Sequence, residues 1–352
     1  MKKYKKSDQQ TSTIYIGVDV HKKNWHVTVR TVEQEVWKGG IAADWEVFEK
    51  ILKRYSDHKI SVVYEAGYSG FWLYDRIVCW GAECIVTPPS LIPSDYGNRV
   101  KNDRIDSSKL ALMLSRQMLK AVWVPDGESR RHRQVLRRRN QLVSDRKRIQ
   151  CRIKSEAACF GLVLPEIRGK WTQTFAQHLW QLRFGDRWQT ESFQRLLTEY
   201  QMVSELIDQQ TKLLKELSET DRYQEPLARL TSVPGIGLIT GMEVLLELGD
   251  LNRFRRGTQL AAYVGLTPSQ YSSGEKVRLG AITGIGKPRL RADLIEAAWT
   301  LISKDEAQKT RYEQLKFRCG SKRAIVATAR RLLLTLRRLV LDQQDYRPAT
   351  AA

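Results

Sequence analysis

The chain has 352 residues, and its 59 Lys and Arg against 39 Asp and Glu give a formal net charge of +20. This length is enough for two or three domains, and the charge favours a polyanionic partner, with nucleic acid ahead of an anionic membrane surface. No apolar run approaches the ~20 residues of a membrane-spanning helix, no signal region follows the basic N-terminus, and the five cysteines are scattered, which favours a soluble intracellular protein.

The first third of the chain has the periodicity of alternating strands and helices. Apolar runs predict strands over residues 14–20, 25–29, 32–37, 60–64 and 83–87. Helical spacing predicts helices over residues 44–55, 71–80 and 105–119. Three strands followed by alternating helices and strands predict an α/β domain with a mixed sheet, in the order of a ribonuclease-H-like domain.

The middle of the chain is predicted to form two long helices. Residues 128–154 contain eleven Lys and Arg and only two acidic residues, and Val135, Leu142 and Ile149 recur every seven residues beneath this charge. The second helix, over residues 191–219, keeps a heptad of apolar positions. Its members are Phe193, Leu196, Tyr200, Val203, Ile207, Leu214 and Leu217. Such a pair suggests a helical arm or an oligomerisation coiled coil.

From Leu227 onward the composition is that of a globular, mainly helical domain, which ends in a long helix over residues 322–342. We therefore expect domains over residues 1–125, 126–225 and 226–345, with a short tail over 346–352.

Four carboxylates stand out in the first predicted domain. Asp19 lies in the alternating first strand, Glu65 ends the fourth strand, and Asp103 and Asp106 are spaced i, i+3 at the start of a helix. Grouped carboxylates need a cation between them, and a pair of Mg²⁺ ions is the usual device for cutting phosphodiesters. The alternatives are a solvated or hydrogen-bonded aspartate on the strand and ordinary acidic capping at the helix start.

The segment Pro234-Gly235-Ile236-Gly237 precedes an apolar helix. Glycines at Gly235 and Gly237 let backbone N–H groups approach a phosphate at the positive end of a helix, as in helix-hairpin-helix contacts with DNA. A tight turn between two helices is the other interpretation. The later segment Gly280–Pro288 is not a phosphate-binding P-loop, because its glycine spacing is off by one and Pro288 stands where Ser or Thr is required.

A polar segment over residues 265–280 contains adjacent serines before a glycine, with Lys276 and Arg278 nearby. A serine hydroxyl among cations can meet a phosphate, but serine is a weak nucleophile that needs activation. From these residues alone a polar turn is favoured, and Ser272 cannot be distinguished from Ser273.

The arginine run of the first long helix has two interpretations, a solvated face or a contact with a phosphate backbone. Like charges spaced i, i+3 and i+4 destabilise a helix, which favours the phosphate contact. Its members include Arg130, Arg131, Arg133, Arg137, Arg138, Arg139, Arg146, Lys147 and Arg148.

Taken together and in this order, the motifs resemble the DEDD transposases of bacterial insertion sequences, also called bridge-RNA-guided recombinases. Residues 16–22 resemble the opening strand of that family, 64–67 its Glu motif and 101–106 its paired-Asp motif. The segment around Gly235 and residues 265–280 resemble its C-terminal domain. Asn102 and Ser107 depart from the common residues of the family without removing a carboxylate.

The resemblance implies a DNA transposase or recombinase of the bacterial cytoplasm, associated with the nucleoid. Its RuvC-like domain would hold Mg²⁺ through Asp19, Glu65, Asp103 and Asp106. Ser273, directly before Gly274, matches the nucleophilic serine of the family and would form a phosphoserine link to DNA. A structured guide RNA would select the target, and dimers or tetramers would assemble composite sites.

Two other functions stay open on the residues alone. The carboxylates by themselves also fit a RuvC-like, structure-specific endonuclease such as a Holliday-junction resolvase. A nucleic-acid-binding scaffold with a degenerate metal site is the non-enzymatic alternative.

Overall fold

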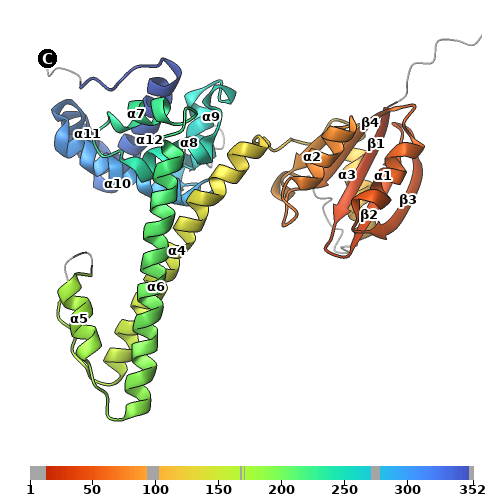
Figure 1. Cartoon of the computed structure of the whole chain (residues 1–352). Helices are drawn as coiled ribbons and strands as arrows, with labels where there is room; N and C mark the ends of the chain where they lie inside the picture. Colours follow the sequence, from red (N-terminus) through yellow and green to blue (C-terminus); the bar gives the residue numbers. More distant parts are fainter. Residues whose placement is uncertain (1–12, 93–102, 167–168, 170, 271–277, 349–352) are drawn as a thin grey trace, which may run out of the picture. The chain divides into compact units, whose positions relative to one another are not determined.

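The computed structural model describes residues 13–92, 103–166, 169, 171–270 and 278–348, without the side chains of residues 103–105 and 279 (Figure 1). The chain divides into two compact units, Met1–Val124 and Pro125–Ala352. The basic helices that we expected as a middle domain belong to the second unit.

The first unit is built on a five-stranded mixed sheet with strand order β3-β2-β1-β4-β5. The strands are β1 (Thr13–Val20), β2 (Asn24–Arg30), β3 (Glu35–Ala42), β4 (Lys59–Glu65) and β5 (Glu83–Thr87). β1, β2 and β3 pair antiparallel, whereas β4 and β5 continue parallel to β1. The mixed α/β class is thus confirmed, and the topology is consistent with a ribonuclease-H-like domain.

Helices cover both faces of this sheet (Figure 1). The face carrying Ile16 packs with Phe48 of α1 (Trp45–Arg54) and Leu73 of α2 (Trp72–Trp80) in one buried cluster. On the other face, Leu110 of α3 (Asp103–Ser115) packs with Val63 of β4. The 3-10 turn η1 (Pro89–Leu91) follows β5.

The predicted bounds of the third strand, 32–37, and of α3 were wrong, and β3 covers Glu35–Ala42. Val32 was expected in the third strand but is 62% exposed, in a turn where the N–H of Thr31 donates to the carbonyl of Gln34. α3 ends at Ser115 rather than near residue 119, and Gln117 beyond it has a left-handed φ of 55°. Both errors occurred where local turn geometry overrode apolar periodicity.

The second unit begins with two long antiparallel helices, α4 (Gly127–Cys159) and α6 (Arg187–Ser218), which run side by side (Figure 1). Leu136 near the start of α4 shares a buried cluster with Leu214 near the end of α6, and Ile153 shares another with Phe193. The short helix α5 (Gln173–Gln181) contributes its own residues to the second cluster.

The predicted heptad of α6 is therefore used within the chain, against α4. Leu142 and Ile149 of α4 are buried as expected. On α6, Leu197 is buried at 2% exposure while its predicted neighbour Leu196 is half-buried. An oligomerisation role for these helices stays a prediction.

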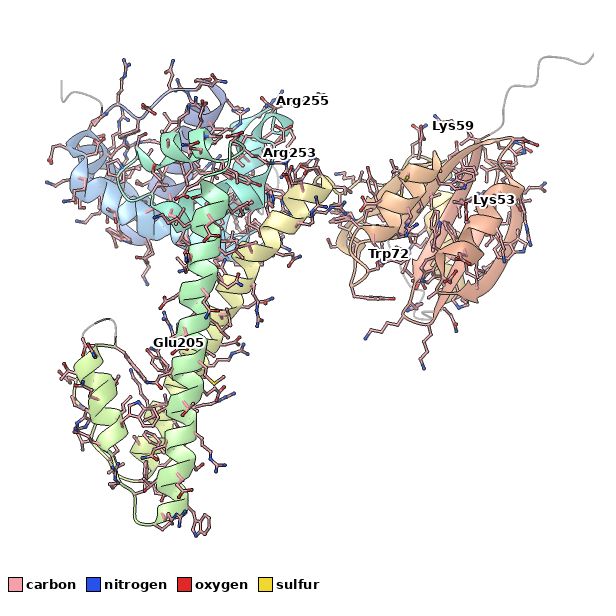
Figure 2. All side chains as sticks on the ribbon, viewed as in Figure 1. Lys53, Lys59, Trp72, Glu205, Arg253 and Arg255 are labelled. Atoms are coloured by element: carbon pink, nitrogen blue, oxygen red, sulfur yellow. The ribbon has the colours of Figure 1, made fainter. Side chains whose placement is uncertain are left out.

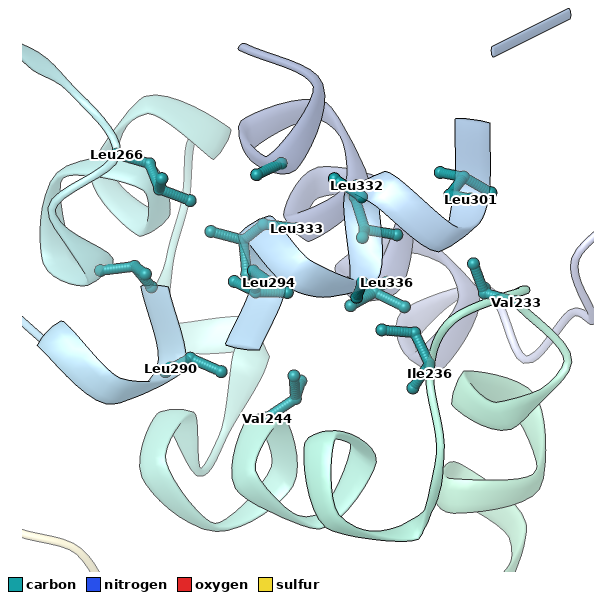
Figure 3. Close-up of a cluster of buried hydrophobic side chains, with 14 of the residues drawn as sticks. Val233, Ile236, Val244, Leu266, Leu290, Leu294, Leu301, Leu332, Leu333 and Leu336 are labelled. Atoms are coloured by element: carbon teal, nitrogen blue, oxygen red, sulfur yellow. The ribbon is translucent and has the colours of Figure 1, made fainter. Parts of the chain in front are cut away.

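The remaining helices form the largest apolar core of the second unit (Figure 3). They are α7 (Gln224–Thr231), α8 (Leu238–Leu248), η2 (Leu251–Arg253), α9 (Gly257–Val264), α10 (Pro288–Lys304), α11 (Glu306–Cys319) and α12 (Ser321–Leu341). A two-stranded hairpin of β6 (Pro268–Gln270) and β7 (Leu279–Ile282) separates α9 from α10.

Two features extend this core towards its surface. Arg253, which is labelled in Figure 2, lies over the rings of Phe254 and Tyr263, at 4.0 and 4.5 Å from their centroids. Tyr346, expected in a tail, is docked, because its backbone N–H donates to the Ser232 hydroxyl and its own hydroxyl donates to Asp305. Among the described residues, no helix is long and apolar enough to cross a membrane.

Candidate active site

The parallel pairing of β1 with β4 determines where the first two carboxylates lie. Val18 pairs with Tyr64, so Asp19 and Glu65 follow at the same end of neighbouring strands. The side chain of Asp19 is 17% exposed, and its Oδ2 is 3.0 Å from His21 Nε2. Two carboxylates at adjacent strand ends make an oxygen-rich edge of the sheet.

Gly17 brings α3 close to this edge. A Cβ atom at Gly17 would lie 2.2 Å from the carbonyl oxygen of Ser107 and 2.6 Å from the backbone nitrogen of Ala111. Only a glycine allows the backbone of α3 to come so near β1. Asp106 immediately precedes Ser107 and is half-buried, so this contact determines how far the helix carrying Asp106 stands from the strand carrying Asp19.

Hydroxyl groups fix α3 on the sheet from the neighbouring strands. Thr28 Oγ1 of β2 is 3.0 Å from Ser107 Oγ, in a buried hydrogen bond, and Lys38 of β3 donates to Ser108 Oγ at 2.7 Å. Ser107, noted above only as a departure from the family pattern, therefore takes part in holding the helix that carries the paired Asp motif.

The donor set at this edge fits a hard divalent cation, because carboxylate oxygens are the ligands such ions prefer. Within the described residues, however, no three Asp, Glu, His or Cys side chains gather into a metal-binding group. The side chain of Asp103 lies outside the described residues. The four-carboxylate site therefore stays a prediction, which the strand register and the Gly17 contact support.

The two glycines of the second candidate contact, Gly235 and Gly237, have different surroundings. Gly235 has a left-handed φ of 91°, and a Cβ there would lie 2.6 Å from the carbonyl oxygen of Ala297 in α10. Tight packing thus accounts for this glycine. A Cβ at Gly237 would meet no atom within 4 Å, so the N-terminus of α8 at Gly237 is the part of this turn open to close approach.

Some arginines of the α4 run have partners inside the unit, and others lie at its surface. Arg137 donates to both carboxylate oxygens of Glu247, at 2.7 and 3.0 Å, and Lys287 Nζ lies 2.7 Å from Glu247 Oε2. The buried Arg133 donates to the carbonyl of Leu246. Arg133 and Arg137 therefore have partners inside the unit, although the side chain of Arg137 is 43% exposed, and Arg131 and Arg138 are exposed as well. Contacts of the run with nucleic acid stay predictions.

The carboxylate of Glu247 is the centre of a clamp that the sequence did not reveal, defined here as Arg137, Glu247 and Lys287. Burial raises the pKa of Glu247, but hydrogen bonds from Arg137 and Lys287 outweigh it and hold the pKa at about 2. The clamp joins α4, α8 and the first residue before α10. Arg137 is 110 positions and Lys287 is 40 positions away from Glu247 in the sequence, so no local sequence pattern predicts that the three side chains meet.

An open cleft of about 1060 Å³ lies beside the clamp, between α4, α8 and α10. Its cationic lining includes Arg138, Arg148 and Arg289, and its acidic lining includes Glu243, whose side chain is only 3% exposed. Burial, followed by the neighbouring Asp293 carboxyl, raises the pKa of Glu243 to about 8.

The serine segment lies mostly outside the described residues. Ser272, Ser273 and Lys276 fall between β6 and β7 and are not described, whereas Arg278 is described and exposed. The hairpin that flanks the segment is described, and Ser269 of β6 donates to the carbonyl of Ala281 in β7.

Comparison with known proteins identifies the family. Residues 16–156 match a DEDD transposase model of the IS110 type, and residues 227–313 match the transposase family IS116/IS110/IS902. The putative transposase y4qE of Sinorhizobium fredii is 30% identical over 293 residues, covering 81% of this chain and 71% of that protein. The chain belongs to the DEDD transposases of insertion sequences.

Two further relatives of this transposase carry similar names. The transposase for insertion sequence element IS1533 of Leptospira borgpetersenii is 27% identical over 292 residues, which are 81% of this chain and 84% of the relative. The transposase for IS1111A of Coxiella burnetii is 28% identical over 270 residues, which are 75% and 72%.

The candidate functional residues of the transposase fall in two separate matched segments. The DEDD segment includes all four carboxylates, and its family implies use of a divalent metal ion. The second segment includes Gly235 and Ser273 and ends at residue 313, before α12. As a DNA transposase the protein acts on DNA, in agreement with its charge of +20.

Proposed function

We propose that this transposase cuts and rejoins the DNA of its insertion sequence through a covalent serine–DNA link, with Mg²⁺ held by Asp19, Glu65, Asp103 and Asp106. The register of β1 and β4, together with the close contact of α3 at Gly17, carries this proposal. Both features direct carboxylates to one end of the sheet. When bound there, the metal supplies charge stabilisation to the phosphate and lowers the pKa of an oxygen ligand.

Ser273 has the part of nucleophile in this reaction. Its Oγ forms a bond to phosphorus, the P–O bond to the leaving DNA strand breaks, and a proton passes from the serine hydroxyl to the released strand end. Rejoining reverses these changes with a new DNA hydroxyl. One phosphodiester is exchanged for another at each step, so no nucleotide hydrolysis is needed.

Target choice belongs to an element-encoded RNA in this proposal, with base pairing reading the sequence. The basic residues Arg131, Arg138 and Arg278 are exposed and suited to phosphate contacts that carry no sequence information. A homodimer or homotetramer brings carboxylates and serine to each of the strands that are exchanged. The net charge of +20 and the order of the family's motifs along the chain support both the guide RNA and the homo-oligomer.

The decisive experiment looks for protein covalently attached to DNA. The intact protein is incubated with Mg²⁺, a plasmid carrying the element and RNA transcribed from its non-coding flank, and adducts that survive denaturation are separated and mapped. We expect an adduct at Ser273, none with Ser273→Ala, and an unchanged yield with Ser272→Ala, which is the matched control.

The metal part of the proposal needs its own pair of variants. Asp106→Asn should abolish adduct formation while phosphate-driven DNA binding persists, and the exposed Asp57→Asn should behave like the parent protein. An adduct that persists in Ser273→Ala would refute the serine assignment. Strand cutting without any adduct would favour the resolvase-type endonuclease, and the absence of cutting under all conditions would favour the scaffold.

A further inference from the structure

α11 and α12 pack against each other and enclose a hollow of about 470 Å³ at their surface. Three arginines line it, Arg311 and Arg318 from α11 and Arg331 from α12, together with Gln314 and Leu315. All three arginines are exposed. The hollow is separate from the clamp and the cleft beside α4, and the matched family segments end at residue 313.

These arginines have no acidic neighbours on their own helices. No acidic residue stands three or four positions before or after Arg311, Arg318 or Arg331, and Lys322 is the one charged residue among these positions. No ion pair within the described part of the chain engages them. The lysines of α11 differ, because Lys309 pairs with Glu306 at 3.2 Å and Lys316 with Glu313 at 3.1 Å.

Three guanidinium groups around one hollow repel one another, and an anion between them removes that repulsion. A guanidinium presents a planar fork of N–H donors that matches the oxygens of a phosphate. The wider surface has the same sign, with seven Lys and Arg and a single acid between residues 311 and 331. A run of phosphates suits such a surface better than one small anion does.

The helix α11, which supplies Arg311 and Arg318, also carries an exposed aromatic ring. Phe317, directly before Arg318, is 95% exposed. Phenylalanine side chains are usually buried in folded proteins. Unpaired bases stack on such rings, whereas the bases of a duplex are already stacked on one another. The ring therefore favours a strand whose bases are accessible.

We propose that the hollow of Arg311, Arg318 and Arg331 binds the phosphodiester backbone of a single-stranded nucleic acid, with Phe317 stacking an unpaired base. This inference rests on the proposed function, because it gives the transposase a second nucleic-acid contact, in which Phe317, Arg318 and Arg331 lie beyond the matched family segments. The strand is either guide RNA or unwound DNA, which share the same backbone charge.

The test measures how binding depends on salt. Fluorescence anisotropy records the affinity of the full chain for unpaired RNA, unpaired DNA and duplex DNA over a series of salt concentrations. The variant Arg311→Gln/Arg318→Gln/Arg331→Gln is compared with Lys304→Gln/Lys309→Gln/Lys316→Gln, which loses the same charge from exposed positions nearby. Circular dichroism checks that both remain folded.

Each phosphate contact contributes about 0.7 to the slope of log affinity against log salt on a single strand, so we expect the arginine variant to lose about 2 from that slope. The lysine variant should lose much less, because its lysines are paired or remote from the hollow. Phe317→Ala should weaken binding of unpaired strands by about tenfold and leave the slope unchanged.

Equal slopes in the arginine and lysine variants would overturn the proposal while leaving the transposase reaction intact, provided that the adduct at Ser273 still forms. Equal effects of Phe317→Ala on duplex and unpaired strands would overturn the stacking role. If the parent protein bound no nucleic acid in a salt-dependent way, both this inference and the proposed function would fail.

Discussion

A Glu247→Gln substitution removes the negative charge on which Arg137 and Lys287 converge, and its effect on stability can be worked out from the clamp. The pKa of Glu247 falls from 4.5 to about 2 on folding. At about 1.36 kcal/mol for each pKa unit, ionised Glu247 contributes about 3 kcal/mol to the free energy of unfolding. The carboxylate is only 10% exposed, so screening by water reduces this little.

The sign of the pH dependence follows from the lowered pKa. The contribution is fully present above pH 4.5 and is lost as the pH falls through about 2. Urea unfolding, followed by far-ultraviolet circular dichroism, should therefore find the variant less stable by about 3 kcal/mol at neutral pH. The difference between the two proteins should shrink towards zero in acid.

Glu225→Gln is the matched control, because Glu225 also pairs with an arginine but is 76% exposed. Its effect should stay below about 1 kcal/mol. If Glu247→Gln were as mild as this control at neutral pH, or if its deficit persisted unchanged in acid, the clamp would not be the source of the stability that we assign to it.

Further predictions concern three other sites. Gly17→Ala should lower the free energy of unfolding of the first unit by about 1–3 kcal/mol and reduce adduct yield, because its Cβ meets backbone atoms; Gly40→Ala, whose nearest contact is 3.5 Å, should do neither. Gly235→Ala should lower the melting temperature, whereas Gly237→Ala should spare it and weaken DNA binding in a titration. With a pKa raised to about 8, Glu243 stabilises the fold below pH 4.5 and loses this effect as the pH rises through 8, so Glu243→Gln should flatten the decline in unfolding free energy between these values.

The sequence predicted the elements of the sheet because strand periodicity is local. Ile14, Ile16 and Val18 alternate, and all three are buried on one face as the alternation requires. The same alternation put Gly17 and Asp19 on the opposite face, where α3 packs. It did not reveal that Gly17 serves a backbone contact, since that depends on a helix ninety residues later.

The sequence was least informative where distant parts of the chain determine a residue's surroundings. The phosphate interpretation of Gly235 came from its neighbours in sequence and stays a prediction, whereas its close packing depends on Ala297 of α10. The heptad of α6 predicted Leu196 inward, and Leu196 does pack half-buried against a core cluster, but it missed the fully buried Leu197, because 3.6 residues per turn drift from a seven-residue repeat. Arg137 appeared as one member of a basic face until Glu247 was found opposite it.

The clamp couples two parts of the second unit mechanically. Arg137 belongs to the long helix α4, and Lys287 stands five residues after the hairpin strand that follows the serine segment. Because both cations hold one carboxylate, α4 cannot move away from Glu247 without leaving that buried charge with a single partner. We therefore expect strain applied along α4 to be transmitted through Glu247 to the base of the hairpin.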